Sequence, residues 1–119
     1  MKVLMVGDVV GGLGRKILQR ELKSVRAKFG IDAVVVNAEN AAAGSGITAA
    51  LAEEIFSCGA DAITLGDHTW GQKEFAGQIS SVKNLVRPAN FPSECPGAGW
   101  CVVTTGISRF AVVNLQGRV

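Results

Sequence analysis

A chain of 119 residues with a formal net charge of +2 has room for one domain and one hydrophobic core. The charge is small and the lysines and arginines are not gathered in one block, so the composition gives no support for binding to DNA or to an acidic membrane surface. The three cysteines are odd in number and lack C-x-x-C spacing, which argues against a disulfide framework and indicates reduced thiols in a cytoplasmic protein.

The first predicted element is a strand over residues 3–6, followed by a glycine-rich turn over residues 7–14. The strand is too short, and reaches Asp8 too soon, to be a signal peptide or a membrane span. A helix is predicted from about Arg15 to Phe29. Its apolar face is made of Leu18, Leu22, Val25 and Phe29.

The glycine-rich turn raises the alternative of a nucleotide-cofactor site and an oxidoreductase. Its glycines fit neither G-x-G-x-x-G nor G-x-x-x-x-G-K-[ST], so this alternative is weak. Glycines that merely permit a tight turn would explain the spacing. They would not explain the charged Asp8 in the same turn.

A second unit consists of a strand over residues 33–36, a loop of small residues over 41–46 and a helix that Thr48 caps and that runs to about Cys58. Right-handed crossovers between such units predict a parallel sheet. A third strand, over residues 62–65, is followed by a short helix predicted from about Gln72 to Ile79.

The character of the chain changes after Leu85. A short strand leads into a long loop with several prolines, and two more strands, over residues 100–104 and 110–114, flank Gly106 as a hairpin. The predicted fold class is therefore α/β, with a mainly parallel sheet, flanking helices and a C-terminal hairpin.

Three carboxylates, Asp8, Glu39 and Asp67, each follow a predicted buried strand. The carboxyl ends of parallel strands meet at one edge of a sheet, so we expect these side chains to converge. Each close pair would repel by on the order of 4 kcal/mol at about 4 Å and an effective dielectric near 20. A bound divalent metal ion would offset this repulsion, with Asn40 as a neutral oxygen ligand.

Five other side chains have both a functional and a structural explanation. His68 is the only histidine, and taken alone it is better explained as a hydrogen-bonded structural residue than as a catalytic one. Trp70 is expected to pack in the core. Arg87 and Arg118 fit either phosphate contacts or surface ion pairs and are assigned to neither, and Asn90 is interpreted as a turn residue.

Five motifs follow one another along the chain: Gly7-Asp8-Val9-Val10-Gly11, Asn37-Ala38-Glu39-Asn40-Ala41-Ala42, Gly66-Asp67-His68-Thr69-Trp70, Asn84-Leu85-Val86-Arg87-Pro88-Ala89-Asn90-Phe91-Pro92 and Asn114-Leu115-Gln116-Gly117-Arg118. Together they resemble the YmdB-like branch of the calcineurin-like metallophosphoesterases. The resemblance implies half of a four-layer α/β/β/α sandwich. It also implies a phosphodiesterase or phosphatase that acts on cyclic nucleotides, in particular 2',3'-cyclic ones, or on related phosphoesters.

The resemblance assigns a role to each site residue. It implies two divalent metal ions, chosen from Mn, Fe, Mg and Zn, held by Asp8, Glu39, Asn40 and Asp67. His68 would be the catalytic general acid that protonates the leaving oxygen. The oxygen-rich ligand set favours Mn or Mg.

The chain departs from the family pattern in two ways. Asp67 stands where the family has asparagine, so we expect tighter metal binding and weaker phosphate binding, because a carboxylate has no N–H to donate. Family members are longer and carry further histidine ligands. Residues 1–119 are thus expected to be one truncated N-terminal domain, completed by a missing C-terminal half or a second copy. The alternative is a catalytically incomplete half-domain that binds metal or a partner.

Overall fold

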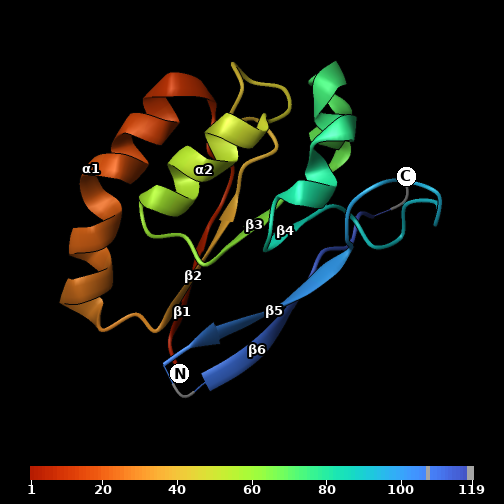
Figure 1. Cartoon of the computed structure of the whole chain (residues 1–119). Helices are drawn as coiled ribbons and strands as arrows, with labels where there is room; N and C mark the ends of the chain where they lie inside the picture. Colours follow the sequence, from red (N-terminus) through yellow and green to blue (C-terminus); the bar gives the residue numbers. More distant parts are fainter. Residues whose placement is uncertain (107, 118–119) are drawn as a thin grey trace.

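A four-stranded parallel sheet forms the centre of the computed structural model, which describes residues 1–106 and 108–117. Its strands lie in the order β1 (Val3–Val6), β2 (Ala33–Asn37), β3 (Ala62–Thr64) and β4 (Leu85–Val86). Two helices cover one face and a hairpin lies at the other (Figure 1). The predicted α/β fold with a mainly parallel sheet is confirmed.

The register of the sheet brings the strand ends together. Val6 lies opposite Val36, and Asn37 lies opposite Thr64, so β1, β2 and β3 end at the same edge. The first four residues of β2 are fully buried, as expected for an inner strand covered on both faces. The turns that follow these strands are thereby neighbours.

The helices are α1 (Gly11–Phe29) and α2 (Ala49–Ser57). Two details of the α1 prediction were wrong. The helix begins at Gly11 and not at Arg15, because the Gly11 amide donates to the carbonyl of Asn40 and Gly11 adopts a φ of 54° that glycine tolerates. Leu18 and Leu22 are buried, but Phe29, the last residue of α1, is 54% exposed.

The helix predicted over residues 72–79 is wrong. The chain after β3 forms three short 3-10 helices, η1 (Asp67–Trp70), η2 (Lys73–Gly77) and η3 (Ile79–Ser81), and the last two replace the predicted helix. Phe75 and Ile79 are buried as predicted. The backbone at Gly71 packs so closely on Gly46 that a Cβ at residue 71 would lie 2.7 Å from the Gly46 amide nitrogen. This tertiary contact sets the path of the segment, and local helix propensity does not.

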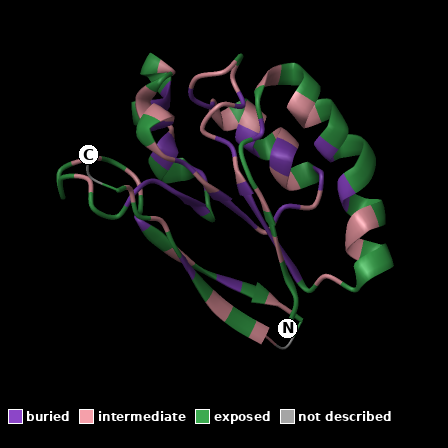
Figure 2. Ribbon diagram, turned by 180° about the vertical axis from the view of Figure 1, so that it is seen from behind, coloured by how far each residue is buried: buried purple, intermediate pink, exposed green. Residues whose placement is uncertain are grey.

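The hairpin consists of β5 (Trp100–Thr105) and β6 (Ser108–Val113), which pair in antiparallel fashion as predicted. Its Val103 and Val112 pack against the sheet, on Val35, Ala62 and Val86. The opposite face of the hairpin is exposed (Figure 2). Among the residues on it are Trp100, Val102 and Val113.

Two further predictions concern the cysteines and the membrane. Cys58, Cys95 and Cys101 carry free thiols, as expected. Within residues 1–106 and 108–117, no helix is long and apolar enough to cross a lipid bilayer.

Candidate metal centre

Two carboxylates and the imidazole meet at the carboxyl ends of β2 and β3. Glu39, Asp67 and His68 each offer one potential ligand atom, and these atoms all lie within 4.8 Å of one another. Glu39 lies in the turn after β2, while Asp67 and His68 begin η1 after β3. The side chains of Asp67 and His68 are 68% and 44% exposed. The predicted convergence holds for Glu39 and Asp67.

Glu39 is held in place by the turn that carries the other two residues. Its Oε2 accepts the backbone N–H of His68 at 3.0 Å, and its Oε1 accepts from the side-chain Nδ2 of Asn37 at 3.4 Å. A Cβ on residue 66 would lie 2.7 Å from Cδ of Glu39, so only glycine fits there. Nothing in the sequence alone assigned a role to Gly66.

Asn40 links Asp8 to His68. Its Nδ2 donates to Oδ1 of Asp8 at 2.7 Å, and its Oδ1 lies 2.5 Å from Nδ1 of His68. A carboxylate can only accept, so the NH₂ group faces Asp8 and the amide oxygen faces the ring. Nδ1 of His68 must therefore carry the hydrogen. Nε2 remains, 3.9 Å from Oδ2 of Asp67.

Asp8 reaches the edge of the sheet through Asn40. It does not belong to the group of mutually close ligand atoms formed by Glu39, Asp67 and His68. Its φ is 48°, a left-handed conformation that costs a non-glycine residue on the order of 1 kcal/mol. The amide of Val9 donates to the carbonyl of Asn37, which ties the Asp8 turn to β2.

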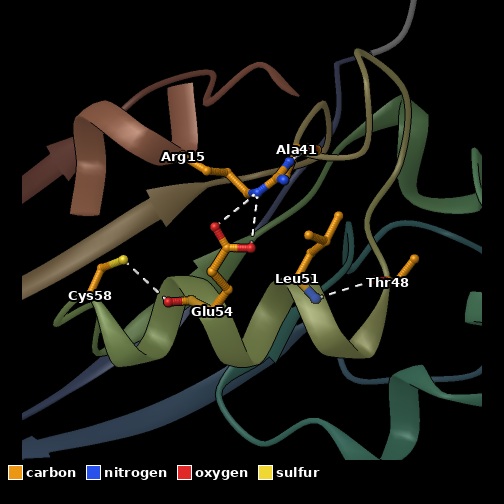
Figure 3. Close-up of polar contacts among 6 residues, drawn as sticks. All are labelled: Arg15, Ala41, Thr48, Leu51, Glu54 and Cys58. Carbon is orange, nitrogen blue, oxygen red and sulfur yellow. Dashed lines mark hydrogen bonds and ion pairs between the residues drawn. The ribbon is translucent and has the colours of Figure 1, made fainter. Parts of the chain in front are cut away.

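The loop after Asn40 is anchored to both helices by Arg15 (Figure 3). The Nη1 of Arg15 donates to the carbonyl of Ala41 at 2.5 Å, and its Nε lies 3.1 and 3.2 Å from the two carboxylate oxygens of Glu54. The same view shows Thr48 capping α2 by accepting the amide of Leu51. No local sequence signal indicated that Arg15 supports the site, because its partners lie 26 and 39 residues away.

The remaining candidates lie outside the cluster. Arg87 is buried and donates to the carbonyls of Pro88, Cys95 and Pro96. Its guanidinium is thus held by backbone carbonyls and not placed as a surface ion pair within residues 1–106 and 108–117. Arg118 lies outside the described residues.

Asn90 and Trp70 both have structural environments. Asn90 is exposed and donates to the carbonyl of Gln116, as a loop residue would. Trp70 packs against the core and against Phe91, with ring centroids 6.4 Å apart. The packing role expected for Trp70 is confirmed.

Comparison with known proteins shows which family the chain resembles. The model of the family described as "YmdB-like protein" matches residues 4–119. The chain is 44% identical to the 2',3'-cyclic-nucleotide 2'-phosphodiesterase of Bacillus subtilis (strain 168), over 99% of this chain and 45% of that protein. It spans less than half the length of the curated relatives it matches.

Two crystal structures have the same fold over nearly the whole chain. A hypothetical protein from Thermus thermophilus superposes with a TM-score of 0.89 at 32% identity, over 99% of this chain and 46% of its own. A phosphatase from Mycoplasma pneumoniae superposes with a TM-score of 0.87 at 35% identity, over 98% of this chain and 43% of its own. The chain thus belongs to the YmdB-like family and corresponds to part of longer phosphoesterases.

Proposed function

We propose that this chain carries the metal-binding and acid-donating residues of a phosphodiesterase that hydrolyses cyclic nucleotides or related phosphoesters. The observation that carries the proposal is the meeting of Glu39, Asp67 and His68 within 4.8 Å at the edge of the sheet. Similarity to a protein named 2',3'-cyclic-nucleotide 2'-phosphodiesterase supports the substrate class.

The donor set fits divalent metal ions. Two carboxylates lie beside an imidazole, and Asp8 and Asn40 add further oxygen atoms one hydrogen bond away. Mostly oxygen ligands suit Mn²⁺ or Mg²⁺. When bound, such ions would stabilise the charge on the phosphoryl oxygens and make a water molecule nucleophilic at neutral pH.

His68 is proposed as the general acid. Asn40 holds Nδ1, so Nε2 of the imidazolium form of His68 is the nitrogen that would donate its proton to the leaving oxygen of the ester, which leaves the neutral ring with its hydrogen on Nδ1. Oδ2 of Asp67 lies 3.9 Å from Nε2 of His68. A carboxylate at this position has no N–H for a phosphate oxygen, so Asp67 is assigned to metal binding alone.

The test is hydrolysis of bis-p-nitrophenyl phosphate with Mn²⁺ present and then chelated. Glu39→Gln, which keeps the shape but removes the charge, is expected to abolish metal-dependent turnover. Glu53→Gln on the exposed surface of α2 is the matched control and should leave it unchanged. Turnover that survives chelation or Glu39→Gln would overturn the proposal.

A second candidate is a catalytically incomplete half-domain that binds metal or a partner without hydrolysis. Exposed apolar residues on the hairpin and on β1, namely Trp100, Val102, Val113 and Met5, favour it. Saturable Mn²⁺ binding without turnover would support this candidate. Metal-dependent turnover by the 119-residue chain would exclude it.

A further inference from the structure

The parallel ladder between β3 and β4 ends at a proline. The amide of Leu65 donates to the carbonyl of Val86 at 3.0 Å. In a parallel register, the carbonyl of Leu65 would next accept the amide of residue 88. That residue is Pro88, which has no N–H. The last carbonyl before Gly66-Asp67-His68 therefore lacks its backbone donor.

The side chain of Asn114 supplies this donor. Its Nδ2 lies 2.6 Å from the carbonyl oxygen of Leu65 and 3.3 Å from that of Val86. The backbone of Asn114 is itself anchored, because its N–H donates to Gly99 at 3.1 Å and its carbonyl accepts from Ala89 at 2.8 Å. Asn114 directly follows β6, so its side chain ties the hairpin to the carboxyl end of β3.

The bond acts on the turn that carries the site. A peptide unit is planar, so holding the carbonyl of Leu65 also fixes the direction in which Gly66 leaves the strand. Gly66 lies close to Glu39, because a Cβ at residue 66 would meet the Glu39 carboxylate, and the backbone amide of His68 donates to that carboxylate. We propose that Asn114 is a positioning residue, which replaces the donor that Pro88 lacks and so fixes the turn of Asp67 and His68.

Amide hydrogen exchange tests the positioning without a metal. In Asn114→Leu, the amides of His68 and Thr69, which close this turn, are expected to exchange about tenfold faster. In the double variant Asn114→Leu with Pro88→Ala, residue 88 regains an N–H for the Leu65 carbonyl. Exchange should then return to within about threefold of the parent. Replacing a proline by alanine ordinarily lowers stability, because the unfolded chain gains conformational entropy, so a rescue by Pro88→Ala is specific to the missing donor.

Two controls separate this effect from general loosening. The amide of Leu22, buried within α1, reports on global unfolding and should change little between Asn114→Leu and the parent. Asn90→Ala removes the neighbouring bond to the Gln116 carbonyl and should leave the His68 amide unchanged.

Manganese binding provides the functional readout and rests on the proposed function. Mn²⁺ affinity is expected to fall about tenfold in Asn114→Leu and to recover in the double variant. Failure of the parent chain to bind Mn²⁺ would refute the proposed function, whereas hydrogen exchange would still decide the role of Asn114.

Two outcomes would overturn the inference. One is an unchanged exchange rate of the His68 amide in Asn114→Leu. The other is faster exchange in Asn114→Leu that the addition of Pro88→Ala does not slow. If Asn114→Leu fails to fold, Asn114→Ser with and without Pro88→Ala gives the same comparison, because a serine side chain is too short to reach the Leu65 carbonyl.

Discussion

The close contact between Gly66 and Glu39 leaves no space for a side chain at residue 66. A Cβ at residue 66 would lie 2.7 Å from Cδ of Glu39, whereas carbon atoms pack at about 3.5–4.0 Å. In Gly66→Ala the carboxylate must therefore move by roughly 1 Å. Such a shift lengthens the 3.0 Å hydrogen bond from the His68 amide beyond bonding range.

We expect Gly66→Ala to weaken Mn²⁺ binding by about 10- to 100-fold, the usual effect of disturbing the groups that orient metal ligands. The free energy of unfolding should fall by about 1–3 kcal/mol, as in other overpacked sites. Calorimetric titration with Mn²⁺ and urea denaturation measure the two effects. Gly12→Ala in α1 is the control, because a Cβ there meets nothing within 4 Å, and it should leave the metal affinity unchanged. Parental Mn²⁺ affinity in Gly66→Ala would show that the close contact at Gly66 does not position Glu39 for metal binding.

Three further predictions follow from the same contacts. Asp67→Asn should weaken Mn²⁺ binding several-fold and strengthen binding of inorganic phosphate to the Mn²⁺-loaded chain, because it removes a charge and adds an N–H; titration calorimetry measures both. Arg15→Met should lower the free energy of unfolding by about 1–2 kcal/mol, because it leaves the Ala41 carbonyl and Glu54 without their donor. Glu54→Gln should lower it less, and urea denaturation measures both variants. Burial raises the pKa of the Cys58 thiol, and Glu54 raises it further against an opposing effect of Lys23. As pH rises, the thiol of Cys58 therefore ionises in the unfolded chain before it ionises in the folded chain. The stability contributed by Cys58 is present below the ordinary thiol pKa and is lost as pH rises above it. Cys58→Ala should reduce the fall in the free energy of unfolding between neutral and alkaline pH, measured in urea.

The sheet could be predicted from the sequence because its strands are apolar runs buried on both faces. Val34, Val35 and Val36 form such a run, and a turn with polar residues follows it. The start of α1 could not be predicted, because it depends on a hydrogen bond from Gly11 to Asn40, far away in the sequence. The 3-10 path after η1 likewise depends on the packing of Gly71 against Gly46.

The part of the candidate site that depends only on the order of the strands could be predicted from the sequence. Parallel strands bring their carboxyl ends together, which is enough to expect Glu39 and Asp67 at one edge. The hydrogen bonds that Asn40 donates to Asp8 and accepts from His68 could not be predicted, because they depend on side-chain directions across 32 and 28 residues. The roles of Gly66 and Asn114 likewise become visible only in three dimensions.

The most direct test of whether Glu39 belongs to a metal site is to measure Mn²⁺ binding to the parent chain and to Glu39→Gln. The electron paramagnetic resonance signal of free Mn²⁺, which is lost when the ion binds, provides the measurement. We expect saturable binding by the parent chain, a loss of at least about tenfold in affinity in Glu39→Gln, and no change in Glu53→Gln. Equal Mn²⁺ affinity in the parent chain and Glu39→Gln would contradict this expectation.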